Sequence, residues 1–209
     1  MNNHEQSIER KSVPVVAGTD AFYRENAQSY FDRTFGLPMD HLYRPFLEAV
    51  GERGRILDVG SGSGRDVKAF RALGYDAFGI EASPELAALA SRHVGPYFTV
   101  ARAESFKANE SFDAIWACAS LLHLRRADLY VTIRSLRSLL RPGGVFFATV
   151  QLGAGDNVQS DGRRYTYYSV AEFEDAITEG GLDVLRSWES KDVMRTDGPI
   201  WINVLARRR

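Results

Sequence analysis

The sequence contains a single cysteine, Cys118, among its 209 residues. An internal disulfide is therefore excluded, and so are zinc sites built from several cysteines. The four histidines are scattered, without the spacing of metal ligands. We expect no metal site. We interpret Cys118 as a small buried core residue and not as a nucleophile, because no feature that would lower its pKa accompanies it.

The sequence also lacks an excess of charge of either sign. Its 26 Lys and Arg balance 27 Asp and Glu, which leaves a formal net charge of −1. Such a chain has no overall field to hold it on nucleic acid or on an anionic membrane. We therefore expect a partner that is recognised locally, with nucleic acid unlikely and no membrane.

Long hydrophobic runs are missing as well. The longest apolar stretches, such as Val145 to Val150, have the length of a buried strand and are far too short to span a bilayer. The first residues do not combine a charged start with an apolar core, as a signal peptide does. These absences predict a reducing, cytoplasmic location.

The order of polar and periodic segments predicts one domain after a short tail. Residues 1–19 are polar and without periodicity, which is typical of a loose N-terminal tail. Residues 20–209 are expected to form a single domain, in which residues 20–50 are a helical cap and residues 51–209 are the core. Helical spacing within 20–35 and 42–50, separated by Gly36-Leu37-Pro38, predicts two helices in the cap.

Short apolar runs alternate with helical patterns through most of the core. Buried strands are predicted at 55–59, 76–80, 98–101, 112–117 and 145–150, with helices at 65–73, 84–93 and 127–140. This alternation predicts an α/β fold: a Rossmann-like, mostly parallel sheet with helices on both faces and ligands at the carboxyl ends of the strands.

The last part of the core follows a different pattern. An irregular stretch runs from Gln151 to Tyr168, and Ser169 with Glu172 forms a capping box that opens a helix to about residue 179. Residues 182–188 and 200–206 are predicted to close the fold as two strands, with an antiparallel strand at the C-terminal end of the sheet.

A glycine-rich loop is the strongest functional signal. The segment Asp58-Val59-Gly60-Ser61-Gly62-Ser63-Gly64 ends a predicted strand and opens a predicted helix, and Glu81 ends the next strand. In that context glycines let the backbone approach a ligand, and the acid can accept both hydrogen bonds of a ribose diol. The alternative is a tight turn beside a surface glutamate. Glycines at 60, 62 and 64 depart from Gly-x-Gly-x-x-Gly, which disfavours an NAD-binding oxidoreductase but keeps it as an alternative.

Four features together resemble the class I S-adenosylmethionine-dependent methyltransferases: Asp58-x-Gly60-x-Gly62-x-Gly64, Glu81, Phe112-Asp113 and Leu140-x-Pro142-Gly143-Gly144. The resemblance extends over about residues 23–208. At a finer level, the segment from Ile115 to Leu124 and the closing Trp201-x-Asn203-x-Leu205 are similar to small bacterial tellurite-resistance methyltransferases.

The resemblance implies S-adenosyl-L-methionine as the cofactor and a set of residues around it. Those implied for the methionine and ribose are Asp58, Gly60, Ser61, Gly62, Gly64 and Glu81. Ala82, Ala103 and Glu104 would lie beside the adenine, with Arg102 where an acid is common, and Ala117 would flank the methyl group. Tyr23 would lie in a helix that covers the pocket, where Tyr30 and Arg33 can share its face.

The implied reaction is in-line transfer of a methyl group to a nucleophile. His123, just past the fourth strand, is the only histidine predicted near the site, and we expect it to act as a base or to bind substrate; the alternative is a histidine packed at the start of the next helix. Arg163, Arg164 and Tyr165 are expected to read the substrate, with a solvated loop as the alternative.

The expected acceptor is a small molecule. Enzymes that methylate exocyclic amino groups of bases typically carry Asn or Asp before Pro-Pro after the fourth strand, whereas this chain has Ala117-Cys118-Ala119-Ser120. A module that binds S-adenosylmethionine without turnover remains as a further alternative. The sequence does not define the oligomeric state.

Overall fold

The computed structural model describes residues 18–209, so nearly all of the expected N-terminal tail lies outside the described residues. Within this range, a seven-stranded sheet has the order β3-β2-β1-β4-β5-β9-β8. The strands are β1 (Arg55–Val59), β2 (Asp76–Glu81), β3 (Phe98–Val100), β4 (Phe112–Ala117), β5 (Leu140–Gln151), β8 (Leu182–Lys191) and β9 (Ile200–Arg208). The first five pair in parallel, whereas β9 is antiparallel to both β5 and β8. The predicted fold class is confirmed.

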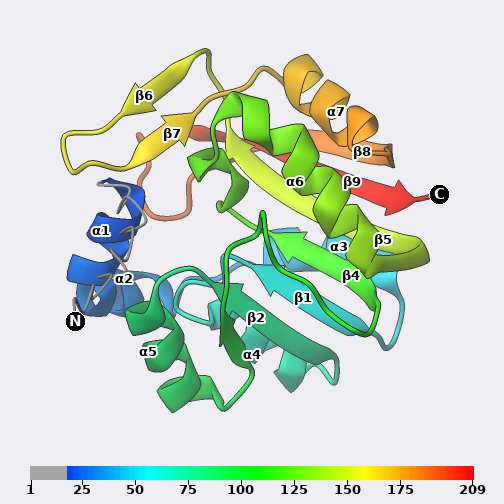
Figure 1. Cartoon of the computed structure of the whole chain (residues 1–209), viewed down its shortest axis with the longest axis horizontal. Coiled ribbons are helices and arrows are strands. Elements are labelled where there is room, and N and C mark those ends of the chain that lie inside the picture. Colours follow the sequence, from blue (N-terminus) through cyan, green and yellow to red (C-terminus); the bar gives the residue numbers. More distant parts are fainter. Residues whose placement is uncertain (1–17) are drawn as a thin grey trace, which may run out of the picture.

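Helices cover both faces of this sheet. The helices of the core are α4 (Arg65–Ala72), α5 (Pro84–Val94), α6 (Arg126–Leu139) and α7 (Val170–Glu179). In β1, Leu57 packs with α6 and α7, whereas the adjacent Ile56 packs with α4 and the cap helix α3 (Asp40–Val50). Figure 1 shows α6 in front of the sheet and α3 and α4 behind it. Because both of its faces are covered, the sheet has inner strands that are mostly apolar and buried, as in β1 and β4.

The cap differs from its expected form. The pattern over 20–35 predicted one helix, but the chain forms α1 (Thr19–Glu25) and α2 (Ala27–Thr34). Asn26 separates them with φ −110° and ψ 16°, and its side-chain amide donates to the carbonyl of Phe22 at 2.9 Å. Asparagine competes in this way with the helical backbone, which explains the break. Ala27 and Phe31 of α2 then pack against Leu86 and Leu89 of α5.

The stretch expected to be irregular contains a hairpin. It consists of β6 (Asp156–Val158) and β7 (Arg164–Thr166), which pair antiparallel beside the short 3-10 helix η1 (Leu121–His123). In addition, β5 begins at Leu140, five residues earlier than predicted, because Leu140 pairs with Phe112 before the register shifts. Within residues 18–209, no helix is both long and apolar enough to cross a membrane.

Several segments far apart in sequence meet at one edge of the sheet. The parallel strands end there in the glycine loop, Glu81, Ala117 and Gln151. Because β9 runs in the opposite direction, its first residues lie at the same edge, together with the connection from β8. This edge is where parallel α/β sheets bind their ligands.

Candidate active site

The glycine loop is held against the ends of two strands. The N–H groups of Gly60 and Ser61 both donate to the carbonyl of Ile80, at 2.9 and 3.0 Å. Gly60 has φ +70°, and a Cβ at this position would lie 2.5 Å from the Cβ of Ser120. Only glycine fits both the dihedral angle and the close approach. The loop therefore runs directly beside the residues that follow β4.

Glu81 is bound to the same loop. Its Oε2 accepts from the N–H of Gly62 at 2.8 Å, and its Oε1 accepts from the N–H of Ser83 at 2.9 Å. Burial raises the pKa of this carboxyl, while the backbone donors lower it in part. Two carboxylate oxygens offer about four acceptor positions, so positions remain for the hydroxyls of a ligand.

Glu81 lines a cavity of about 580 Å³, here named the Glu81 cavity. It contains most of the predicted cofactor residues: Tyr23, Gly60, Gly62, Glu81, Ala82, Ala103 and Glu104. Arg102, which stands where an acid is common, pairs with Asp20 at 2.6 Å and lies 3.6 Å from Glu104. The structure thus brings together the residues expected around ribose and adenine.

Three predicted cofactor residues lie beneath the cavities instead of lining them. Asp58 is 1% exposed, and burial raises the pKa of its carboxyl. A Cβ on Gly64 would lie 2.7 Å from Phe98, so this glycine permits close packing of α4 against β3. Ala117 is fully buried, and Ala119, two residues later, lines the cavities in its place.

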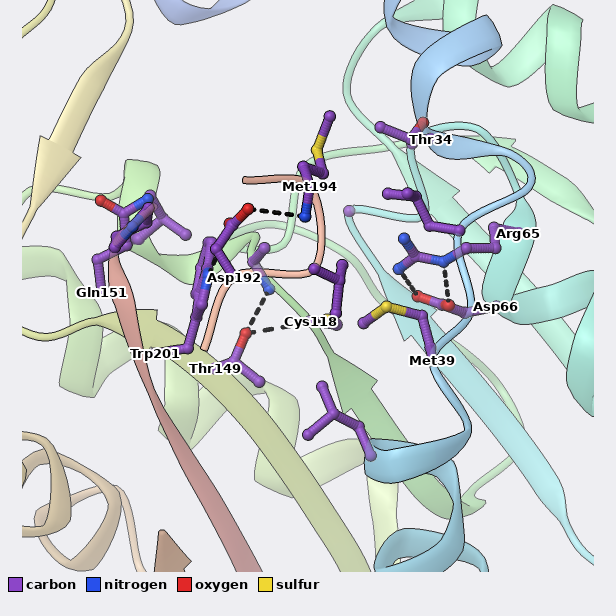
Figure 2. A pocket seen from close by; sticks show the side chains of 18 of the residues that line it. Thr34, Met39, Arg65, Asp66, Cys118, Thr149, Gln151, Asp192, Met194 and Trp201 are labelled. Atoms are coloured by element: carbon purple, nitrogen blue, oxygen red, sulfur yellow. Dashed lines mark hydrogen bonds and ion pairs between the residues drawn. The ribbon is translucent and has the colours of Figure 1, made fainter. Parts of the chain in front are cut away.

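A second cavity, of about 400 Å³, also borders the glycine loop and is here named the Trp201 cavity. Figure 2 shows Arg65 and Asp66 on one side of it and Trp201 and Gln151 on the other. The predicted Ser61 and the cap residue Arg33 also line it. The two cavities share a wall formed by Tyr23, Tyr30, Gly60, Gly62, Ala119 and His123.

A buried ion pair at the start of α4 lines the Trp201 cavity. Arg65 donates to both carboxylate oxygens of Asp66, at 2.7 and 2.9 Å, and Tyr43 and Trp116 donate to the same carboxylate at 2.5 and 2.9 Å. Burial raises the pKa of Asp66, but the Arg65 guanidinium and these donors outweigh burial and lower it. The sequence analysis did not identify this network, because Tyr43 and Trp116 lie 23 and 50 residues from Asp66 in the chain.

His123 is enclosed between α1 and β7. Its Nε2 lies 2.9 Å from the hydroxyl of Tyr23, and its Nδ1 lies 2.7 Å from the carbonyl oxygen of Arg164. Because a carbonyl only accepts, Nδ1 carries the proton, and Tyr23 donates to Nε2. Burial lowers the pKa of His123 to about 4, so the ring is neutral near pH 7.

The residues predicted to read the substrate surround both cavities. Arg163 and Tyr165 line the Trp201 cavity, whereas Arg164 lines the Glu81 cavity. Each guanidinium has a carboxylate partner: Arg163 pairs with Asp161 at 2.7 Å, and Arg164 lies 3.6 Å from Asp156. Arg163 also lies 4.1 Å from the ring centroid of Phe22 in α1.

Cys118 lines the Trp201 cavity, but burial raises its pKa to about 12, so it remains a thiol. The next residue, Ala119, has φ +53° and donates its N–H to Thr149 Oγ1 at 2.9 Å. Among residues 18–209, no group of three or more His, Cys, Asp and Glu side chains is arranged to hold a metal ion.

The connection between β8 and β9 was missed by the sequence analysis. Asp192 accepts from the backbone N–H of Met194 and Arg195 and, at 3.0 Å, from Nε1 of Trp201. These residues line the Trp201 cavity. The spacing of Trp201 and Asn203 was the available signal, since residues two apart in a strand share a face.

The donor set fits S-adenosylmethionine. Within the described residues, Asp58 Oδ2, Ser61 Oγ and Ser120 Oγ are buried without a hydrogen-bond partner, and all three belong to the glycine loop or its neighbour. Buried polar atoms of this kind normally have a partner. Ser61 and Ser120 line the cavities. Together with the open positions on Glu81 and the tyrosines of the shared wall, their hydroxyls suit a ligand with ribose hydroxyls, an amino group and a cationic centre.

The family model of a methyltransferase domain matches residues 30–187, and the chain belongs to this family. Among curated proteins, it is similar to a ubiquinone biosynthesis O-methyltransferase of Xanthomonas campestris, with 36% identity over 100 residues, 44% of this chain and 41% of that protein. The chain thus matches less than half the length of its curated relatives.

Solved structures of other proteins share the fold, and two examples show the degree of similarity. The 1,6-didemethyltoxoflavin-N1-methyltransferase of Burkholderia thailandensis, with bound 1,6-didemethyltoxoflavin and S-adenosylhomocysteine, has a TM-score of 0.72 at 20% identity over 94% of this chain and 92% of that chain. The magnesium protoporphyrin IX methyltransferase of Synechocystis PCC 6803, with bound S-adenosylmethionine, has a TM-score of 0.71 at 13% identity over 91% and 95%.

These findings confirm the predicted methyltransferase family. The two solved neighbours were crystallised with S-adenosylhomocysteine or S-adenosylmethionine, which is the cofactor that the sequence predicted. The finer resemblance to tellurite-resistance methyltransferases stays a prediction, and so does the cytoplasmic location.

Proposed function

We propose that this protein transfers a methyl group from S-adenosylmethionine to a nucleophilic atom of a small molecule. The observation that carries the proposal is the wall between the two cavities, which contains Gly60, Gly62 and Ala119 from the strand ends and Tyr23 and His123 from the cap and η1. A cofactor with its ribose and adenine in the Glu81 cavity would extend its methionine arm past these residues into the Trp201 cavity and meet an acceptor there, which supplies the proximity that such a transfer needs.

The proposed cofactor contacts follow from the two cavities. Glu81 would accept the ribose hydroxyls, while Ala82, Ala103 and Glu104 border the adenine in the Glu81 cavity. Arg33 and Arg65 line the Trp201 cavity beside the glycine loop and are the cations suited to the carboxylate of the methionine. Asp66 occupies Nε and Nη2 of Arg65, which leaves Nη1 for this contact.

The bound cofactor supplies a methyl group on a sulfonium sulfur, and in-line attack by the acceptor leaves the electron pair of the broken bond on sulfur. The chain's own contribution is alignment and exclusion of water. Tyr23 and Tyr30 present aromatic surface at the shared wall, which favours a cation. His123 contributes an unprotonated Nε2, the nitrogen able to take a proton from the acceptor through the Tyr23 hydroxyl.

The proposed acceptor site is the Trp201 cavity, which Arg163 and Tyr165 line. Arg164 lines the neighbouring Glu81 cavity. The relatives support a small acceptor, because their names concern ubiquinone biosynthesis and 1,6-didemethyltoxoflavin.

A turnover experiment distinguishes this function from that of a module that only binds the cofactor. Incubation with methyl-labelled S-adenosylmethionine and a metabolite extract should yield S-adenosylhomocysteine and one labelled small molecule by mass spectrometry. Binding of the cofactor without either product would contradict the proposal.

A further inference from the structure

One wall of the Trp201 cavity is a row of polar and aromatic side chains that the proposed cofactor contacts leave unused. In the register of β5 and β9, Thr149 lies opposite Asn203, and Gln151 lies opposite Trp201. Residues directly opposite each other, and residues two apart in a strand, point to the same face of a sheet. The four side chains therefore share one face, and all four line the cavity. Figure 2 labels three of them, Thr149, Gln151 and Trp201.

The orientation of the Asn203 amide is determined by its neighbours. Its Nδ2 donates to the carbonyl oxygen of Trp188 and to Oγ of Ser190, both at 3.0 Å. Because a carbonyl oxygen only accepts, the amide nitrogen and not the amide oxygen must face Trp188. Oδ1 therefore points away from Trp188. It has no hydrogen-bond partner within residues 18–209, although Asn203 is 0% exposed.

Two of the three neighbours of Asn203 in the row, Thr149 and Trp201, already use their polar atoms. Thr149 Oγ1 accepts from the N–H of Ala119 at 2.9 Å and directs its own proton toward the sulfur of Cys118 at 3.8 Å. Nε1 of Trp201 donates to Asp192. The polar atom of the indole is thus used, and what Trp201 presents to the cavity is apolar ring surface. The Gln151 amide is only half-buried, whereas Asn203 Oδ1 is a fully buried acceptor of this row without a partner within residues 18–209.

We propose that Asn203 is a substrate-specificity residue whose Oδ1 accepts a hydrogen bond from an N–H or O–H group of the methyl acceptor, while Trp201 packs against the acceptor's apolar body. The inference rests on the proposed function, since it assigns the acceptor to the Trp201 cavity. It also defines a chemical class: small molecules with an apolar ring and a hydrogen-bond donor on the edge of the ring.

The energetics favour this class over isosteres without the donor. A buried acceptor without a partner destabilises a complex, and a site built around such a group discriminates strongly against ligands that leave it unpaired. The Asp192 carboxylate lies beside the same wall, which disfavours an anionic group at this end of the acceptor. At about 400 Å³, the cavity is near the lower end of the range for ligand pockets, so the acceptor is small.

Matched pairs of small aromatic compounds test the proposal in the protein loaded with S-adenosylhomocysteine. Suitable pairs are phenol with anisole, indole with 1-methylindole, and aniline with N,N-dimethylaniline, with affinities measured by ligand-observed nuclear magnetic resonance. In the wild-type protein, the member with the donor should bind at least tenfold more tightly, a difference of about 1.4 kcal/mol.

Three variants assign the preference to one atom. Asn203→Leu has a similar volume without the oxygen, and it should bind both members of each pair equally. Asn203→Asp keeps an oxygen at the position of Oδ1 when its other oxygen is protonated toward Trp188, and it should retain the preference. Ser190→Ala removes one acceptor of Nδ2 but leaves Oδ1 in place, so its preference should stay within about twofold of the wild-type value.

Equal affinities for the two members in the wild-type protein would overturn the proposal, and this comparison requires no variant to fold. A preference that persists in Asn203→Leu would overturn it as well, and so would a failure of every donor compound to bind at millimolar concentration. The affinity for S-adenosylhomocysteine is measured in the same samples. If that affinity is absent, the proposed function fails; if it is normal, only the role of Asn203 fails.

Discussion

The hydroxyl of Tyr23 lies 2.9 Å from Nε2 of His123, although 100 residues separate the two in the sequence. This hydrogen bond connects α1 with η1 at the wall between the two cavities. With Nδ1 bound to the Arg164 carbonyl, the imidazole has a defined tautomer and a buried, neutral ring. The cap, the residues after β4 and the β6–β7 hairpin therefore meet at one side chain.

Burial of this neutral histidine predicts a stability that depends on pH. The pKa of His123 falls from 6.5 to about 4 in the folded state. The stability that the neutral imidazole contributes is thus fully present above pH 6.5 and is lost as the pH falls toward 4. Below pH 4 this contribution does not change further. Between pH 7 and pH 5, the wild-type protein should lose about 2 kcal/mol more unfolding free energy than His123→Gln.

Urea denaturation at the two pH values measures this difference. The charged groups that act on the imidazole, Arg163, Asp161 and Asp20, are common to both proteins. Equal losses of unfolding free energy in the two proteins would contradict a buried neutral imidazole.

Since His123 is neutral from pH 6 to 9, its ionisation should not appear in the pH profile of methyl transfer either. If His123→Ala transfers the methyl group at an undiminished rate across this range, His123 has no part in the reaction.

Replacing Glu81 should weaken cofactor binding. We expect Glu81→Ala to lose about 1 to 3 kcal/mol of binding free energy for S-adenosylhomocysteine, because the ribose hydroxyls lose a charged acceptor. Glu85→Ala is a matched control, since Glu85 lies in the first turn of α5 and lines neither cavity. Glu81→Ala should also unfold more easily, because the N–H groups of Gly62 and Ser83 lose their acceptor. An unchanged dissociation constant would contradict the contact with ribose.

Two glycines of the loop should respond differently to alanine. A Cβ on Gly62 would lie 3.2 Å from the Tyr30 ring at the shared wall, whereas one on Gly64 would lie 2.7 Å from Phe98 and 2.9 Å from Ala90 in the interior. Both glycines have positive φ, so both variants are strained. Gly64→Ala should mainly lower the melting temperature, and Gly62→Ala should mainly weaken S-adenosylhomocysteine binding, at least tenfold. Normal binding by Gly62→Ala would show that the loop does not approach the cofactor.

Arg163, which lines the Trp201 cavity, should affect binding of the methyl acceptor more than binding of the cofactor. We expect Arg163→Ala to raise the KM of the acceptor about tenfold, because it removes a guanidinium that lies over Tyr165 and Phe22. Arg186→Ala, which removes a guanidinium stacked on Trp188 and away from both cavities, is the control. Steady-state kinetics with the acceptor found by mass spectrometry measure both variants. An unaltered KM in Arg163→Ala would leave this segment as an ordinary polar loop.

The sheet could be predicted because burial on both faces leaves a direct pattern in the sequence. The strands at 55–59 and 112–117 have the predicted bounds, since their apolar runs end where the chain leaves the core. The β6–β7 hairpin was not predicted, because its strands are three residues long and β6 is fully exposed. Short exposed strands show no alternation that distinguishes them from a loop.

Within the candidate site, local motifs could be recognised but long-range partners could not. The glycine loop and Glu81 follow from strand, turn and acid in a fixed order. By contrast, the hydrogen bonds of Tyr23 to His123 and of Trp116 to Asp66 join residues 100 and 50 positions apart. Such pairs depend on how the elements pack, and a single sequence contains no local pattern for them.

One calorimetric comparison tests most directly whether the glycine loop and Glu81 form an S-adenosylmethionine site. Titration of the wild-type protein with S-adenosylhomocysteine should show one saturable site, and titration with NADH at the same concentrations should show no heat beyond dilution. Saturable binding of NADH without any response to S-adenosylhomocysteine or S-adenosylmethionine would contradict the assignment of this site and the proposed methyl transfer.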